Sequence, residues 1–439
     1  MTFLGITSIV CFLLVVAALW LPVGKAFLLL VLCAPLTTVA VFNLGENSVL
    51  VYHLIWAIVA IKVVVLRIKS GKRMKTPWLP FLVFCLASTL LALFNGDVLV
   101  VNIDARLANV AFSFQQYTQW AYLAMAISTA WFTTYLLDTG KIGTSDLLNW
   151  LDAGLVVVIV VAFLQLVVPA EILNEFIRNS VHTGYKSVGA RLSSTFQEPS
   201  MLSLYLVPMM GMHVIRFAYQ PNAKSAVLVL LSLVVCLMNN SSSAALGLIV
   251  LPVFVSVWLF VHANSARVSA IVFVAVCIVM VVLTVSASLG AFDNFVSTLL
   301  SKLGGEGVSG SIRSYNAALA ADVFLGHPII GVGWGTVRSE ALLTTWLAEL
   351  GLVGAVLFAK SLINLLRSLL SGSSENRRGG SVRFVASVSG DCVLHIADSM
   401  RRAVLPLAVD CARSRMVYRA FYGEGTARVC PDTNRMFGA

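Results

Sequence analysis

Long apolar runs recur along most of the chain, and they restrict its fold more than any other feature. A typical run holds about 20 residues, the length at which an α-helix crosses the hydrocarbon core of a bilayer. Every backbone N–H and C=O group in that core must be paired within the protein, and a continuous helix pairs them all. The sequence therefore predicts an all-α polytopic membrane protein.

The runs predict about eleven transmembrane helices. They cover 3–22, 26–44, 48–66, 78–95, 117–137, 150–169, 199–218, 225–239, 244–261, 268–288 and 344–366. Composition agrees, because 59% of the residues are hydrophobic and 11% are charged, against about a half and about a quarter in soluble domains.

Basic residues between the spans predict their orientation. The loop 67–77 holds Arg67, Lys69, Lys72, Arg73 and Lys75. Lysine and arginine near span ends are enriched on the cytoplasmic side of a membrane. With this loop inside, the segments 96–116, 171–198 and 289–343 lie outside, so we expect a large external loop between the last two spans.

Charge and cysteine content exclude several classes of protein. The net charge of +10 does not indicate nucleic-acid binding, because the basic residues lie mostly in short loops where membrane topology accounts for them. The eight cysteines form no CxxC pair and no Cys/His group, so neither structural disulfides nor a zinc site is expected. We expect no metal and no cofactor.

Two external segments carry polar residues that a simple connection does not need. Loop 171–198 ends in GARLSSTFQE, with Arg191 and Glu198, directly before Pro199 opens the next span. The second segment is SIRSYNAALAADVFLGHPIIGVGWG and contains Arg313. Guanidinium groups match phosphate oxygens with two parallel hydrogen bonds, so two external arginines suit the binding of a lipid diphosphate.

Structural explanations for these residues stay open. Arg191 could instead meet lipid headgroups at the membrane interface. The glycine run 331–335 lacks the preceding strand and the lysine of a phosphate-binding loop, so turn glycines explain it as well. His327 precedes Pro328, which favours extended backbone and a hydrogen-bonded turn.

Four motifs resemble, in order and spacing, those of the O-antigen ligase and polymerase superfamily. They are RLSSTFQEPS at 191–200, SSSAALGL at 241–248, RSYNAALAADVFLGHPIIGVGWG at 313–335 and WLAELGLVGAVLF at 346–358. The resemblance covers residues 185–366 well and the earlier spans only in hydropathy.

The resemblance implies an inverting, metal-independent glycosyltransferase at the periplasmic face of the bacterial inner membrane. Its substrate would be an undecaprenyl-diphosphate-linked oligosaccharide, with Arg191 and Arg313 stabilising the charge on the leaving diphosphate. The family pattern also fits five substrate-binding residues: Glu198, Tyr315, His327, Gly331 and Gly333. Besides this substrate and the bilayer, the expected partners are a flippase and a chain-length regulator of the same pathway, and no nucleic acid.

The segment before the last span favours a polymerase over a ligase. Ligases of this superfamily resemble one another in having a histidine about nine residues before a Glu-x-Gly sequence. In this chain Glu349–Gly351 matches the Glu-x-Gly sequence, and Glu340 occupies the position of the histidine. A carboxylate could act as general base for an acceptor hydroxyl if burial raised its pKa, and a solvated acid near Arg338 is the structural alternative. A ligase acting on lipid A core and a non-enzymatic transporter of lipid-linked sugars remain alternative functions.

The chain divides into three parts. Residues 1–184 form N-terminal transmembrane helices, and 185–370 form the ligase- and polymerase-like catalytic region, to which the external loops 171–198 and 289–343 belong. Residues 371–439 hold ten arginines, no lysine and no run long enough to span. This break in composition fits a cytoplasmic basic tail or a shifted reading frame.

Overall fold

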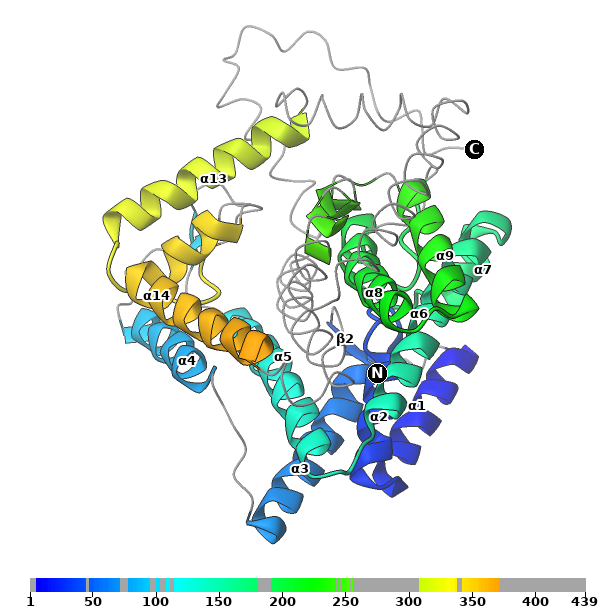
Figure 1. Cartoon of the computed structure of the whole chain (residues 1–439). Helices are drawn as coiled ribbons and strands as arrows, with labels where there is room; N and C mark the ends of the chain where they lie inside the picture. The colour runs from blue at the N-terminus through cyan, green and yellow to red at the C-terminus, as the bar shows by residue number, and fades with distance from the viewer. Residues whose placement is uncertain are drawn as a thin grey trace, which may run out of the picture.

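The computed structural model describes the greater part of the membrane region (Figure 1). Described are residues 5–44, 47–71, 78–94, 100–102, 108–110, 114–180, 191–239, 241, 243–244, 246–248, 250–252, 254–255, 308–337 and 342–371. Of these residues 79% are helical, which agrees with the predicted helical class. Two short hairpins, which an all-α fold does not contain, are the exception.

The described elements are eleven helices and two hairpins. The helices are α1 (Gly5–Trp20), α2 (Val23–Cys33), α3 (Val51–Ser70), α4 (Leu79–Phe94), α5 (Phe114–Asp138), α6 (Thr144–Val167), α7 (Ala170–Phe176), α8 (Pro199–Tyr219), α9 (Ala223–Asn239), α13 (Val308–Gly326) and α14 (Leu342–Ser371). The hairpins pair β1 (Ala40–Leu44) with β2 (Asn47–Leu50), and β3 (Val100–Asn102) with β4 (Ala108–Val110), both antiparallel.

Within the described residues, four helices are long and apolar enough to cross a membrane. They are Val51–Ser70, Thr144–Val167, Pro199–Ala218 and Leu343–Asn364. Four shorter apolar helices accompany them: Thr7–Trp20, Val23–Cys33, Leu79–Leu90 and Ala223–Asn239. The predicted span 268–288 and part of 244–261 lie outside the described residues, so the count of about eleven stays a prediction.

The predicted span 26–44 differs most from the structure. Helix α2 ends at Cys33, the chain turns, and β1 begins at Ala40. An 11-residue helix is about 16 Å long, roughly half the thickness of the hydrocarbon core. The span was wrong because residues 34–44 are as apolar in a turn and strand as they would be in a helix, and hydropathy does not separate the two.

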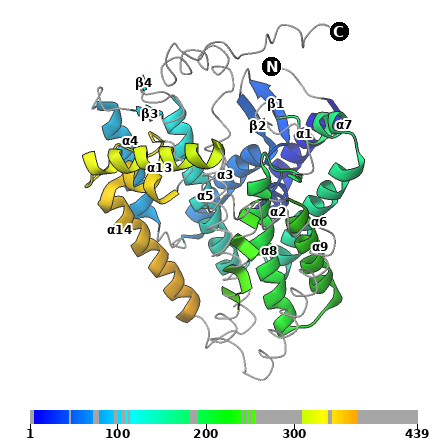
Figure 2. The ribbon, with the colours of Figure 1, turned by 90° about the horizontal axis from the view of Figure 1, so that it is seen from above.

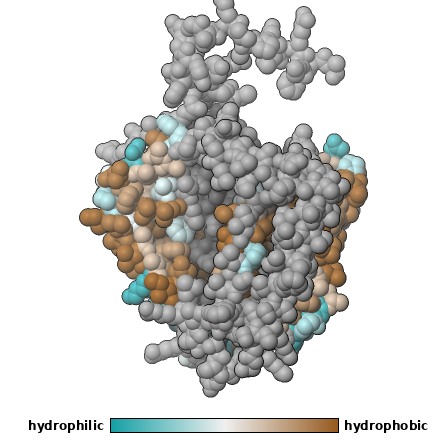
Figure 3. Space-filling model, turned by 45° about the horizontal axis from the view of Figure 1, so that its top comes forward, coloured by the Kyte–Doolittle hydropathy of each residue, from teal (hydrophilic) through white to brown (hydrophobic). Residues whose placement is uncertain are grey.

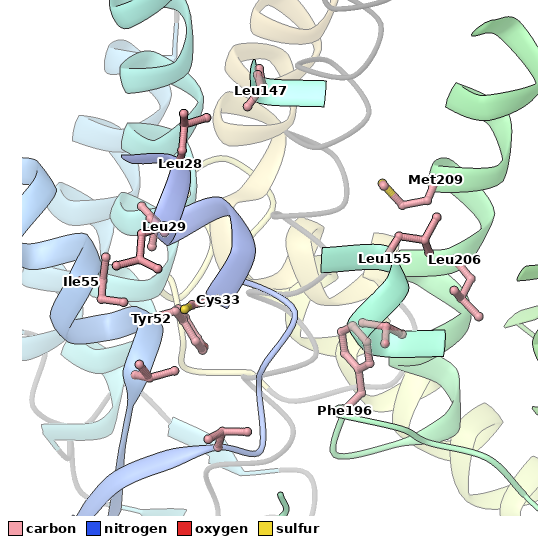
Figure 4. Close-up of a cluster of buried hydrophobic side chains, with 14 of the residues drawn as sticks. Leu28, Leu29, Cys33, Tyr52, Ile55, Leu147, Leu155, Phe196, Leu206 and Met209 are labelled. Atoms are coloured by element: carbon pink, nitrogen blue, oxygen red, sulfur yellow. The ribbon is translucent and has the colours of Figure 1, made fainter. Parts of the chain in front are cut away.

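The helices pack around two main cores, which Figures 1 and 2 show as two lobes. The first core joins α1, α2, α3, α6, α8 and α9 with the C-terminal part of α5. Figure 4 shows part of this core. It includes Leu155 of α6, Leu206 of α8 and Phe196 of the segment that leads into α8. The second core joins α4, α5 and α14. A smaller cluster of buried hydrophobic residues packs α13 against α14.

A buried carboxylate ties three helices of the first core together. Asp152 of α6 accepts hydrogen bonds from Nη1 of Arg216 at 2.8 and 3.0 Å. Nζ of Lys224 lies 2.6 Å from Asp152 Oδ2, and Nε2 of His213 lies 3.4 Å from Oδ1. A buried charge is tolerated only when it is paired, so these contacts hold α6, α8 and α9 in register.

Candidate functional site

The segment 191–198, which leads into α8, is buried although it is not helical. The side chains of residues 192–197 are buried, while Arg191 and Glu198 at its two ends are half-buried. Buried irregular backbone needs hydrogen-bond partners from elsewhere in the protein. The neighbouring elements supply these partners, and we call residues 35–40, 177–180 and 191–198 together the polar layer.

Two side-chain amides from neighbouring helices hold the backbone of this segment. Oε1 of Gln165 accepts hydrogen bonds from the N–H groups of Ser193 and Ser194 at 3.0 and 2.9 Å. Nδ2 of Asn239 donates to the carbonyls of Leu192 and Pro199 at 2.9 and 2.7 Å. The position of the segment next to Arg191 is therefore set by α6 and α9.

The turn after α2 binds the same segment from the other side. The carbonyl of Thr195 accepts hydrogen bonds from Oγ1 of Thr37 at 3.2 Å, and from Oγ1 and N of Thr38 at 3.0 and 3.2 Å. Oγ1 of Thr195 donates to the carbonyl of Pro35 at 2.8 Å. These contacts give a physical reason why the predicted span 26–44 is interrupted, because its hydroxyl groups serve the polar layer.

Residues 177–180, which follow α7, join the layer through the same turn. The carbonyl of Thr38 accepts a hydrogen bond from the N–H of Ser180 at 3.1 Å. Asn179 exchanges two hydrogen bonds with Ala40, at 2.7 and 3.0 Å. Thr38 therefore lies between residues 177–180 and Thr195, and brings the two ends of the predicted external loop 171–198 together.

Arg178 is the residue of this layer that sequence reasoning missed. Its side chain is only 3% exposed, and burial lowers the pKa of its guanidinium to about 10, so it keeps its charge at neutral pH. The signal in the sequence was a second arginine in the same predicted external loop as Arg191. Among the described residues of the layer, Arg178 and Arg191 are the cations and Glu198 is the carboxylate, and this excess of positive charge suits an anionic ligand.

Glu198 stands where the segment becomes helix. It is the N-cap residue of α8, and Pro199 occupies the first turn as predicted. Oγ of Ser200 donates a hydrogen bond to its carboxylate at 3.0 Å. The structure thus places Glu198 on the same short segment as Arg191, and its predicted role in substrate binding stays a prediction.

The second predicted site segment forms α13 and the loop after it. Arg313 lies near the start of α13, and its side chain is outside the described part of the structure. Tyr315 and His327 are exposed. Glu340 belongs to 338–341, outside the described residues, so the predicted general base is not placed.

The glycine loop 331–335 packs against a break in α14. Gly351 interrupts that helix with a φ of 59°. The N–H of Val332 donates to the carbonyl of Ala348 at 3.0 Å, and the N–H of Gly333 donates to that of Glu349 at 2.9 Å. A Cβ atom at Gly331 would overlap the backbone of Glu349. Close approach of two backbones therefore accounts for glycine at this position.

The carboxylate of Glu349 completes this contact. It is fully buried, and its Oε1 accepts hydrogen bonds from the N–H groups of Gly335 and Val337 at 3.1 and 3.2 Å. Sequence reasoning gave this residue no role of its own beyond its place in a motif. Here it fixes the loop to α14, while a substrate-binding role for Gly331 and Gly333 stays a prediction.

The described contacts gather the predicted site residues into two groups. Arg191 and Glu198 lie at the polar layer beside the first core, whereas Tyr315, His327 and the glycines lie on α13 and the loop that packs on α14. In the part of the chain that the structure describes, no group of three or more His, Cys, Asp or Glu could hold a metal ion. The meeting of Arg191 with Arg313 stays a prediction.

No protein-family model matches the chain, and no curated protein is significantly similar to it.

Proposed function

We propose that the chain is a membrane glycosyltransferase that polymerises undecaprenyl-diphosphate-linked oligosaccharide repeat units into surface polysaccharide. The four ordered motifs support this proposal, and so does the polar layer, which is the observation that carries it. A buried, charged Arg178 and a half-buried Arg191 lie on two ends of one loop that Thr38 holds together. Such a layer offers fixed positive charge to a diphosphate.

In the proposed reaction the acceptor hydroxyl oxygen attacks the anomeric carbon of the donor sugar. The bond from that carbon to the diphosphate oxygen breaks with its electron pair, so negative charge grows on the leaving diphosphate. Guanidinium groups near a low-dielectric boundary stabilise this charge, and they need no reorganisation to do so. The hydroxyl proton passes to a general base, for which Glu340 is the proposed residue.

The proposal includes a location. The predicted orientation puts the polar layer at the periplasmic face of a bacterial inner membrane, with about eleven spans in all. The lipid-linked donor then reaches the layer from the outer leaflet, after a flippase has moved it there. A chain-length regulator of the same pathway is the second proposed protein partner.

The test uses purified protein in lipid nanodiscs with a synthetic undecaprenyl-diphosphate-linked repeat unit. We expect longer lipid-linked glycans and free undecaprenyl diphosphate from the wild type. The variants Arg191→Ala and Arg313→Ala should lose both products, while Arg191→Lys should keep part of the activity because a point charge lacks the planar fork.

Lys141→Ala is the matched control, because this exposed lysine lies in the loop between α5 and α6. It should retain full activity. A wild-type protein that leaves the repeat unit unchanged, in membranes where it is monodisperse, would reject the polymerase. Glycan transfer only when lipid A core is added would replace it by the ligase.

A further inference from the structure

The turn between α13 and the glycine loop is apolar and exposed. Leu325 is 72% exposed, Ile329 65% and Ile330 44%. Between Asp322 and Arg338 the sequence holds no Asp, Glu, Lys or Arg. A loop in water rarely exposes adjacent large apolar side chains without a charged neighbour. This exposed surface therefore indicates contact with an apolar partner. We call residues 325–330 the apolar turn.

Hydrogen bonds fix the apolar turn to the break in α14. The N–H of Leu352 donates to the carbonyl of Pro328 at 2.9 Å, and the N–H of Val353 donates to that of Ile329 at 3.1 Å. A Cβ atom at Gly351 would overlap the carbonyl of Ile329. The turn therefore sits beside residues 351–353 of α14 and supplies partners for the N–H groups that the break sets free.

The same part of α14 belongs to a candidate membrane span. Residues 351–353 lie within Leu343–Asn364, which is long and apolar enough to cross a bilayer. Val356 of this span is 65% exposed, and Leu352 and Val353 are exposed as well. Figure 3 shows hydrophobic atoms gathered over the lobe that holds α4, α13 and α14. The exposed surface of the turn thus continues the lipid-facing surface of the span.

We propose that the apolar turn inserts its Leu325, Ile329 and Ile330 side chains into the lipid leaflet beside the break in α14 at Gly351. The occupant of the surface is the acyl region of the bilayer, because the turn is bonded to a spanning helix beside its lipid-facing residues. This proposal amends the predicted topology, in which 289–343 is a loop wholly outside the bilayer. It does not depend on the proposed glycosyltransferase activity.

Two neighbouring groups set the limits of the inserted part. Asp322, exposed on α13 one turn before Leu325, marks the edge that stays in water. His327 is the one titratable side chain within the turn, and it is exposed. A histidine presents an apolar ring with a polar tip, which places it at the headgroup level of the leaflet.

The test places an environment-sensitive NBD fluorophore on single cysteines in proteoliposomes. Leu325→Cys and Ile329→Cys probe the turn in a chain whose eight native cysteines are replaced by alanine or serine. Val356→Cys reports the lipid-facing surface of α14, and Ala318→Cys, about 10 Å before Leu325 along α13, reports the aqueous side. Quenching by nitroxide-labelled acyl chains is compared with quenching by aqueous iodide.

We expect the two turn positions to match Val356→Cys, with blue-shifted emission, strong quenching by the nitroxide lipids and at least a threefold weaker response to iodide than Ala318→Cys. The proposal fails if either turn position responds to the two quenchers as Ala318→Cys does. If the cysteine-free chain does not fold, a photoreactive benzophenone amino acid at 325 and 329 in the wild-type chain replaces the fluorophore. Crosslinks to lipid acyl chains then support insertion, and their absence at either position, with crosslinks at 356, overturns it.

Discussion

Replacing Gly331 by alanine separates a structural from a substrate-binding role of the glycine loop. Gly331 has a φ of 74°, a conformation that costs an L-residue roughly 1–2 kcal/mol. Its new Cβ would also overlap the backbone of Glu349, so the loop must move away from α14. Loss of the hydrogen bonds donated by Val332 and Gly333 adds about 1 kcal/mol each.

These contributions lower the free energy of unfolding by about 3–4 kcal/mol. At about 2 °C per kcal/mol, the lower end for a chain of this size, Tm falls by roughly 6–8 °C. Thermal unfolding of the detergent-purified protein, followed by tryptophan fluorescence, measures this change. Trp334 is a suitable reporter because it belongs to the glycine loop and its side chain is buried in the second core.

Gly326→Ala is the matched control. A Cβ at Gly326 would meet no other atom nearby, so Tm should stay within about 1–2 °C of the wild type. If Gly331→Ala lost activity but kept the Tm of Gly326→Ala, the contact with Glu349 would not be important for stability. The glycine would then serve a ligand, and the structural reasoning given above would be refuted.

Three further predictions follow from the polar layer, the buried carboxylate and the topology. Arg178→Ala should reduce glycan synthesis at least as much as Arg191→Ala does, because its charge is the more deeply buried of the two in the polar layer; synthesis from the lipid-linked repeat unit measures this. Asp152→Asn should lower the free energy of unfolding by about 1–3 kcal/mol, since it weakens the charged hydrogen bonds to Arg216 and Lys224, whose side chains are 21% and 53% exposed; thermal unfolding measures this. A phosphatase fused after Asn179 should be active and one fused after Lys72 inactive, because the basic loop 67–77 is predicted to be cytoplasmic.

Each of these predictions has a control or a contradicting result. Arg178→Lys should keep the fold and serves as the control. If Arg178→Ala gave the product yield of the wild type, Arg178 would not belong to the proposed site. Asp322→Asn changes an exposed carboxylate on α13 and should leave Tm unchanged; an equal effect of both Asp variants would show that the ion cluster adds no stability. Activity of the fusion after Lys72 together with inactivity after Asn179 would invert the topology.

Hydropathy predicted the class of fold and several helices closely. The helices α3 and α8 begin within three residues of the predicted limits, α6 begins six residues before its predicted limit, and Pro199 opens α8 as expected. The reason is that bilayer thickness and the need to pair every backbone group act on each stretch of about 20 residues by itself. Such requirements can be read from a single segment without knowing its neighbours.

The candidate site depended on contacts that no local pattern contains. Thr38 and Thr195 are 157 residues apart, and their hydrogen bond converts part of an apparent span into a turn. The run at 331–335 reads as a flexible or phosphate-binding loop, yet its glycines allow two backbones to pack at Glu349.

The sequence by itself determined that this chain is a helical protein suited to a membrane, because apolar length is a property of each segment alone. Only the tertiary structure decided which polar residues meet: Arg178 enters the layer of Arg191 because β1 and the turn before it bring the ends of loop 171–198 together. Hydrogen bonds between distant segments select one arrangement among many that share the same hydropathy, and that selection is made when the helices pack.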